Sequence, residues 1–465
     1  MRTNLLFSVL LILSAFSIKA QEQSEVLSFE EYLGFVKQYH PFVKQADLAI
    51  NEAEAKLLKA RGAFDPKLEV DFDRKEFKGT EYYDKFNATF KVPTWFGVEL
   101  KGNFQENTGD FLNPENVVPE QGLYSMGVSI PLAKGLLTNK RMAMLKKAKL
   151  YNRQVAAERQ LAVNRILSEA SLAYFNWLQA FKKQQVYQTF LDNASTRLSG
   201  IKKNFELGET PAIDTLEAGI ILKNRVLALE KARIVYIKST LELSNYLWME
   251  GNTPLELQAS VRPDVETLAR VDQVLNTTIV DMEGDAFESH PKMRSLQLKA
   301  EGLDVERRLQ LNNLLPEVNF EYNFLTETPD YASSYTTDNY KTGLSVRFPV
   351  FLRKERGALK MAKLKIQSTE FEIASTRLSL LNKFDAIQSE LISYKSQLGV
   401  ITTIVENYSV LLSAEERKFD LGESSIFLIN SRESKLIEAR LKAIEIENES
   451  FKVKTSLFEL TNFVG

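Results

Sequence analysis

The side chains that most often perform acid–base or metal chemistry are scarce in this sequence. Its 465 residues include no cysteine and only two histidines, His40 and His290. Thiolate nucleophiles, iron–sulfur clusters and cysteine-based zinc sites are therefore excluded. Each histidine precedes a proline, and the two His-Pro pairs are 250 residues apart. This repeated placement favours an architectural role for both histidines over a catalytic one.

The sequence also lacks the motifs of common enzyme classes. It contains no glycine-rich phosphate loop, no Gly-x-Ser-x-Gly and no His-Glu-x-x-His pattern. We therefore predict no catalytic, cofactor-binding or metal-binding residue and no enzymatic activity. The formal net charge of −2 gives no indication of a nucleic-acid partner.

The N-terminus has the pattern of a secretory signal. Arg2 precedes an apolar run from Leu5 to Phe16, and the small residue Ala20 stands before Gln21. We predict that residues 1–20 form a signal peptide removed on export, with an uncleaved N-terminal anchor as the alternative. No cysteine follows that could carry a lipid. No later stretch reaches 18 consecutive apolar residues, so no membrane-spanning helix is predicted after processing.

Landmark residues recur in the same order in two halves of the chain. His40-Pro41 and Pro66 recur as His290-Pro291 and Pro316, at an offset of 250 residues. Phe-Glu-Leu-Gly-Glu at 205–209 recurs as Phe-Asp-Leu-Gly-Glu at 419–423, at an offset of 214. Such recurrence indicates a duplicated unit. The predicted organisation is a first repeat at 21–250, a linker at 251–280 and a second repeat at 281–465.

Each repeat is predicted to contain a helical segment, then strands, then a long helical hairpin. The helical segments lie at about 29–61 and 281–313. Four strands are expected in the first repeat and two in the second. The strand regions, 66–131 and 316–349, begin and end at prolines: Pro66, Pro131, Pro316 and Pro349.

Long proline-free tracts follow both strand regions, which permits very long helices. A glycine just past a helix accepts a positive φ and ends it, so Gly208 and Gly422 predict turns. Near these turns, apolar residues step by three and four, as in coiled coils. The expected helices are 138–206 and 212–248 around a tip at 207–211, and 353–420 and 425–462 around a tip at 421–425.

Apolar and polar residues alternate in the strand regions. Leu68, Val70 and Phe72, for example, alternate with acidic residues. This period of two predicts strands with two unlike faces. Either a transmembrane β-barrel or a soluble sheet with one wet face has this pattern. Aromatic residues near the predicted strand ends, such as Tyr82 and Trp95, fit the aromatic girdle of a barrel.

From Leu27 to the C-terminus, the sequence resembles the TolC family of outer-membrane efflux and secretion channels. The resemblance rests on the duplicated His-Pro, on the strand-opening prolines Pro66 and Pro316, and on the duplicated Leu-Gly-Glu. Other matching motifs are Ile130-Pro131-Leu132, Phe348-Pro349-Val350, Arg141 and Arg356.

The resemblance implies an α+β fold in which three copies form a transmembrane β-barrel continued by a periplasmic α-helical barrel. It implies a passive outer-membrane duct with no cofactor. The expected partners are outer-membrane lipid, a periplasmic adaptor (membrane fusion protein) and, through it, an inner-membrane RND or ABC pump. The adaptor contacts are expected at the tips: Leu207, Gly208, Leu421 and Gly422.

Two features depart from the family pattern. Family members usually supply two strands per repeat, whereas four plus two are predicted here, so either an 18-stranded barrel or a hairpin at 82–106 outside the barrel is possible. Family members also often ring the closed tip with carboxylates soon after the second turn glycine, whereas here that stretch is acidic only at Glu423. The gate is instead expected to close partly through apolar contacts, and the candidate gate residues are Asp214, Phe419, Phe427 and Leu428.

The alternative function is a periplasmic coiled-coil adaptor or scaffold without a pore. Such proteins carry one helical hairpin and no duplication of this kind, which favours the channel. The sequence leaves open the exported substrate and the identity of the pump and adaptor.

Overall fold

The computed structural model describes residues 26–277 and 284–463. The predicted signal peptide at 1–20 lies outside these residues. The described residues form two compact units, one made of 26–44, 163–277 and 383–463, the other of 45–162 and 284–382. Each unit contains parts of both sequence repeats, so the compact units do not coincide with the repeats. Within the described ranges, no helix is both long and apolar enough to cross a membrane.

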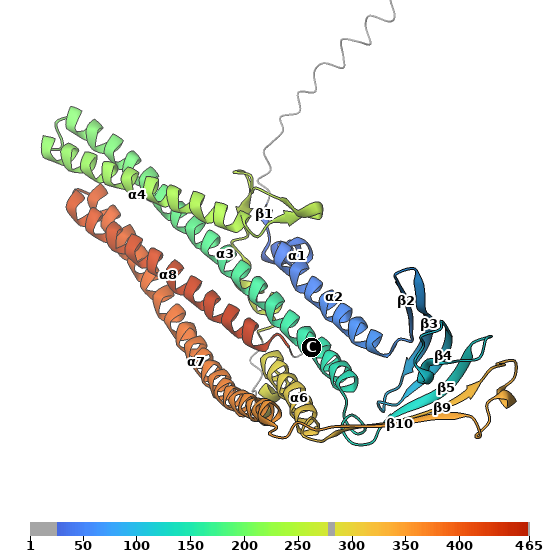
Figure 1. Ribbon diagram of the computed structural model, residues 1–465. Helices are drawn as coiled ribbons and strands as arrows, with labels where there is room; N and C mark the ends of the chain where they lie inside the picture. Colours follow the sequence, from blue (N-terminus) through green and yellow to red (C-terminus); the bar gives the residue numbers. More distant parts are fainter. Residues whose placement is uncertain (1–25, 278–283, 464–465) are drawn as a thin grey trace, which may run out of the picture. The chain divides into compact units, whose positions relative to one another are not determined.

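One antiparallel sheet dominates the unit made of 45–162 and 284–382 (Figure 1). Its six strands lie in the order β10-β9-β5-β4-β3-β2, and every neighbouring pair is antiparallel. The first repeat supplies four strands and the second supplies two. The strands are β2 (Lys67–Phe77), β3 (Thr80–Pro93), β4 (Glu99–Thr108), β5 (Leu123–Pro131), β9 (Glu317–Thr326) and β10 (Tyr340–Arg347).

The alternation of Val98, Leu100 and Gly102 with polar residues predicts a strand at Trp95–Phe104, but β4 begins only at Glu99. The backbone N–H of Thr94 donates to the carbonyl of Val98 at 2.9 Å, which closes a tight turn. Gly97 in this turn has a φ of +79°, a conformation that glycine adopts without strain. The turn therefore occupies residues that the alternation pattern had assigned to the strand.

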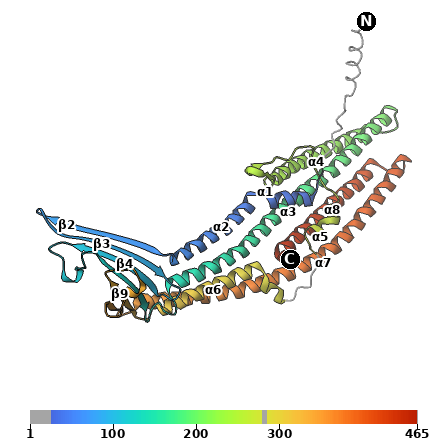
Figure 2. The ribbon, with the colours of Figure 1, turned by 90° about the vertical axis from the view of Figure 1, so that its right-hand side faces the viewer.

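Helices of the same unit lead to and from one end of the strands (Figure 2). They are α2 (Pro41–Arg61), α6 (Pro291–Asn312) and the first parts of α3 (Lys140–Glu206) and α7 (Arg353–Asp420). Ion pairs join neighbouring helices at 2.6–2.8 Å: Asp47–Arg159 between α2 and α3, Lys147–Glu306 between α3 and α6, and Lys299–Glu372 between α6 and α7.

The two histidines stand at helix starts. The expected helix at 29–61 is broken at His40 into α1 (Phe29–Tyr39) and α2. His40 Nδ1 accepts from the Phe42 backbone N–H at 3.3 Å, and His290 Nδ1 accepts from the Lys292 N–H at 3.1 Å. Each imidazole thus caps one backbone donor that the first turn of a helix leaves without a partner.

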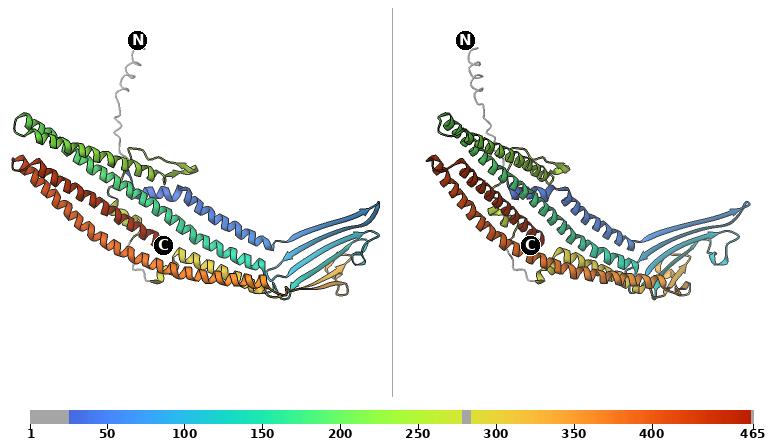
Figure 3. Two further views of the ribbon diagram at one scale, coloured as in Figure 1. Left: turned by 60° about the vertical axis from the view of Figure 1, so that its left-hand side comes forward. Right: turned by 90° about the vertical axis from the view of Figure 1, so that its left-hand side faces the viewer.

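Two helical hairpins dominate the unit made of 26–44, 163–277 and 383–463 (Figure 3). The first joins α3 to α4 (Ala212–Ser244), and the second joins α7 to α8 (Ile426–Thr461). Helices α3 and α7 are 67 and 68 residues long. The predicted α+β class, with its duplicated plan of helix, strands and long hairpin, is confirmed.

The core of this unit is aromatic. Trp177, Tyr174 and Phe175 on α3 are fully buried, and Phe175 stacks on Phe451 of α8 with ring centroids 4.5 Å apart. The Tyr174 hydroxyl donates to the Leu27 carbonyl at 2.8 Å, and burial raises the pKa of Tyr174 to about 12. Short elements complete the unit: β1 (Val26–Leu27), β6 (Trp248–Met249), β7 (Thr253–Pro254), β8 (Arg262–Pro263) and α5 (Thr267–Val274).

Candidate functional site

The sheet has one apolar and one polar face. The pairing places Leu68 of β2 opposite Phe90, Phe90 opposite Gly102, and so on across all six strands. One face therefore carries the even-numbered strand residues and the other face carries the odd-numbered ones. The apolar face includes Leu68, Val70, Phe72, Phe86, Phe90, Leu100, Phe104, Met126, Val128, Ile130, Val318, Phe320, Tyr322, Phe324, Leu344 and Val346.

The apolar face has exposed side chains on every strand except β9, where its residues are half-buried in the single chain. Leu68 on the edge strand β2 is 69% exposed, Met126 on the inner strand β5 is 59% exposed, and Leu344 on the other edge strand β10 is 65% exposed. A contiguous exposed apolar patch of this kind marks contact with a membrane or another protein. Antiparallel sheets of water-soluble domains bury such a face on a core.

The polar face is cross-linked by hydrogen bonds and ion pairs between strands. Lys101 Nζ on β4 lies 2.6 Å from Glu321 Oε1 on β9, reaching past Gly127 on the strand between them. A Cβ at Gly127 would lie 2.2 Å from the Asn323 side chain, so only glycine fits there. Further links are Asn103 to Thr89 at 2.8 Å, Ser129 to Glu321 at 3.2 Å, and Lys91 to Glu69.

The predicted boundary prolines lie at the helix-side end of the sheet. Pro131 is the last residue of β5, and Pro66 stands just before β2. The Pro316 carbonyl accepts from the Lys134 N–H at 3.1 Å, which joins the two strand regions just outside the sheet. Pro349 comes two residues after β10. Trp95 stacks on Phe64 at this end, with centroids 5.7 Å apart, so aromatic side chains lie where a girdle was expected.

The two hairpin tips have the same backbone structure. Gly208 and Gly422 have φ values of +79° and +76°. The N–H of each glycine bonds a carbonyl three residues back at 2.9 Å, and the N–H of the following glutamate bonds one five residues back at 2.8 Å. This is the Schellman helix end. It leaves the preceding leucines in solvent, with Leu207 72% and Leu421 75% exposed.

The candidate gate residues lie in different surroundings. Phe427 and Leu428, in the first turn of α8, are exposed, and Asp214 in the first turn of α4 is half-buried. Phe419 instead packs between the hairpins, against the apolar clusters that include Ile201 and Ile429. The structure therefore places two of the four side chains on the open surface of the tip.

A buried ion cluster joins the hairpins, and the sequence reasoning missed it. Glu433 of α8 is fully buried, and its Oε2 accepts from Arg197 of α3 at 3.1 Å and from Arg225 of α4 at 3.5 Å. No local motif marks this carboxylate, because its two partners come from helices more than 200 residues away in the chain.

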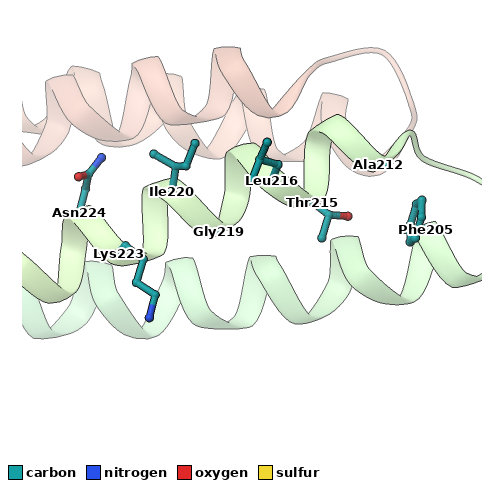
Figure 4. A pocket seen from close by; sticks show the side chains of 8 residues that line it. All are labelled: Phe205, Ala212, Thr215, Leu216, Gly219, Ile220, Lys223 and Asn224. Carbon is teal, nitrogen blue, oxygen red and sulfur yellow. The ribbon is translucent and has the colours of Figure 1, made fainter.

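The hairpins bury equivalent faces unequally. α4 begins at Ala212 and α8 at Ile426, which keeps the repeat offset of 214 residues. On α8, the inward residues Ile426, Ile429 and Glu433 are buried against the first hairpin. Their equivalents on α4 are Ala212, Thr215 and Gly219, which line an open groove of about 640 Å³ (Figure 4). The other lining residues are Phe205, Leu216, Ile220, Lys223 and Asn224.

An exposed apolar stripe continues from this groove along α4. Its residues recur every seven positions, which is the spacing of a coiled-coil seam. The stripe was not predicted above, although its seven-residue period is visible in the sequence. The stripe consists of Ile213, Ile220, Leu227, Ile234 and Leu241, all at least half exposed.

The described residues contain no group of three or more histidine, aspartate or glutamate side chains that could hold a metal ion. The surfaces described above are an apolar sheet face, a polar sheet face, two exposed leucine tips and an exposed apolar stripe on α4.

Comparison with known proteins gives structural matches only. No protein-family model matches the chain, and no curated protein matches its sequence. The CmeC outer-membrane channel of Campylobacter jejuni matches with a TM-score of 0.66 at 12% identity, over 93% of this chain and 85% of that one. VceC of Vibrio cholerae matches with a TM-score of 0.65 at 12% identity, over 93% and 95%.

The open state of the MtrE outer-membrane channel of Neisseria gonorrhoeae matches with a TM-score of 0.64 at 11% identity, over 93% of this chain and 88% of that one. The chain therefore has the fold of the TolC-family outer-membrane channels.

Proposed function

We propose that this protein is a passive duct in the outer membrane, through which substrates leave the periplasm or an inner-membrane pump. The observation that carries the proposal is the apolar face, which runs over all six strands and has exposed side chains on five of them, while the opposite face is polar. Lipid covers such a face, and water fills the polar side of a closed barrel. The fold shared with outer-membrane channels supports the same location.

Three copies form the working assembly in this proposal. One chain supplies two hairpins, and its α4 stripe and groove have no covering partner among the described residues. Packing an apolar seam of this period against helices of a second copy removes it from water. The hairpins then enclose a helical tunnel in the periplasm.

The exposed leucine tips serve as the docking points for a periplasmic adaptor, which connects the duct to an RND or ABC pump. Leu207 and Leu421 are suited to this role because rigid Schellman turns hold them outside the helical core. Energy comes from the pump, so the duct itself needs no reactive side chain and acts without enzymatic activity.

Cell fractionation tests the location and assembly. The expected result is a heat-resistant trimer in detergent extracts of the outer membrane, together with loss of export from a strain lacking the protein. A soluble periplasmic monomer would refute the duct and favour the scaffold.

The adaptor role needs a separate test. Leu207→Asp with Leu421→Asp is expected to leave the outer-membrane trimer intact and to abolish export. The control is Lys202→Asp with Lys203→Asp, which alters exposed positions of α3 beside the tip. If export survives the leucine changes, the tips do not dock an adaptor.

A further inference from the structure

We propose that strand β2 of one copy pairs with strand β10 of the next, so that three copies close an 18-stranded barrel. The β3–β4 hairpin, which contains residues 82–106, is then part of the barrel wall. This inference rests on the proposed function and specifies how the membrane part is closed.

The first observation is that β3 and β4 are inner strands. β3 pairs with β2 over its length, and β4 pairs with both β3 and β5. A hairpin outside the barrel would have to leave a sheet in which it is paired on both sides. The open edges are β2 and β10, whose outer sides have no strand partner among the described residues.

Strand direction allows this closure. Six strands that are antiparallel to each neighbour place β2 and β10 in opposite directions. β10 is therefore antiparallel to the β2 of a following copy, and the alternation continues without a break around the ring. Inside a membrane this pairing is required, because an open edge would leave backbone N–H and C=O groups without partners.

The two faces of the sheet restrict which residues of β2 and β10 can oppose each other. Even-numbered residues point to the apolar side on both edges, such as Val70 on β2 and Leu344 on β10. Only registers that oppose even to even and odd to odd keep the apolar face continuous, because a slip of one residue would turn every side chain to the other face.

Strand ends and tilt select one register. Each residue of a strand opposes one residue of the neighbouring strand, so a row of opposed residues can be followed across the sheet. The row that starts at Leu68, beside the helix end of β2, ends at Tyr340, at the far end of β10. Opposing Lys67 to Arg347 brings the helix ends of the two strands level and pairs all eight residues of β10. In this register Tyr340 opposes Arg74 of the next copy. Arg74 lies six residues further along β2 than Leu68, where the row began.

This shift agrees with the geometry of known barrels. Six residues rise about 20 Å along a strand, while six strands span about 29 Å across the sheet. The corresponding strand tilt is about 35°, within the usual range for closed barrels. All the paired residues of β2 also lie before the irregularity between Lys75 and Glu76.

The resulting pairs are chemically reasonable. Val70 opposes Leu344 on the lipid side, and Asp73 opposes Lys341 on the side of the lumen. Lys67 and Arg347 carry like charges, but they meet at the strand ends, where Glu317 already lies 3.8 Å from Arg347. A barrel of this strand number leaves a water-filled channel.

Disulfide cross-linking tests the register, and the cysteine-free chain gives no background. Asp73→Cys with Lys341→Cys, oxidised in intact outer membranes, is expected to give covalently linked trimers on non-reducing gels. β2 and β10 lie at opposite edges of one sheet, so the link forms between copies. The control Glu69→Cys with Lys341→Cys is four residues out of register and should remain monomeric on the same gels.

Gln105→Cys with Lys341→Cys tests closure without β2 and β3, because β4 would then meet β10. Cross-linking of this pair, or no linking of either pair in a trimer that resides in the outer membrane, overturns the 18-stranded closure and leaves the duct intact. Absence of the protein from the outer membrane refutes the proposed function itself.

Discussion

Arg197 and Glu433 form an ion pair between the two hairpins, with Nη1 and Oε2 3.1 Å apart. Glu433 is fully buried, and Arg225 lies 3.5 Å from the same carboxylate oxygen. Burying a carboxylate costs several kcal/mol unless cations and hydrogen bonds compensate. The cluster therefore ties α8 to α3 and α4 and disfavours arrangements that separate them.

Removing the carboxylate should loosen the hairpin pair. Glu433→Ala leaves two largely buried arginines without their anion, which we expect to cost on the order of 3 kcal/mol. Amide hydrogen exchange at 190–201 and 426–437 in detergent should then accelerate. Glu438→Ala, which breaks an exposed pair with Lys435, is the control and should change little. Unchanged exchange in the Glu433 variant would show that the cluster does not hold the hairpins.

The tip glycines should not tolerate a side chain. Gly422→Ala places a Cβ on a residue with a φ of +76°, which we expect to destabilise the turn by about 1 kcal/mol. Gly200→Ala is the matched control, since Gly200 lies inside α3 with open space around it, and alanine there should stabilise the helix. Thermal unfolding of the purified protein measures both. A stabilising Gly422→Ala would contradict the role of the positive φ.

His40 should make stability depend on pH. Burial lowers the pKa of His40, so the folded protein keeps this imidazole neutral while the unfolded chain binds a proton near pH 6.5. The contribution of His40 to stability should thus be constant above about pH 7 and should fall as the pH drops below about 6.5. Asparagine also caps helices and does not titrate, so His40→Asn should reduce this fall in melting temperature. An equal pH dependence in both proteins would exclude His40 as its source.

Local signals explain what could be predicted from the sequence. The Leu-Gly-Glu turns, the alternating strands and the proline-free helices are each encoded within a few neighbouring residues. Glu433 could not be identified, because its burial depends on three helices that meet only in the fold. The late start of β4 depends on the turn at Gly97, which competes with a good alternation pattern. The break at His40 does have a local signal, because a proline disfavours helical backbone in the residue before it, but the prediction of one helical segment at 29–61 did not use that signal.

The closed tip is predicted to depend on apolar contacts. Phe427 is 65% exposed in the single chain, so contact with its copies near the threefold axis would remove it from water. We expect Phe427→Ala to raise channel conductance in planar bilayers. Asp214→Ala is the comparison, because its carboxylate is the polar alternative for the gate. If Asp214→Ala opened the channel and Phe427→Ala did not, an apolar gate would be excluded.

The two faces of the sheet should respond oppositely to charge. Met126 and Ser125 are neighbours on β5, but Met126 lies on the apolar face and Ser125 opposes Asn103 on the polar face. Met126→Arg places a guanidinium in lipid, at a cost of about 2–4 kcal/mol near the membrane centre, whereas Ser125→Arg projects into water. Denaturant titration of the protein in lipid vesicles should therefore show a large loss of stability for Met126→Arg and a small one for Ser125→Arg. Equal losses would mean that the apolar face is covered by protein, because a packed interface penalises arginine without requiring lipid, and the membrane assignment of the sheet would fail.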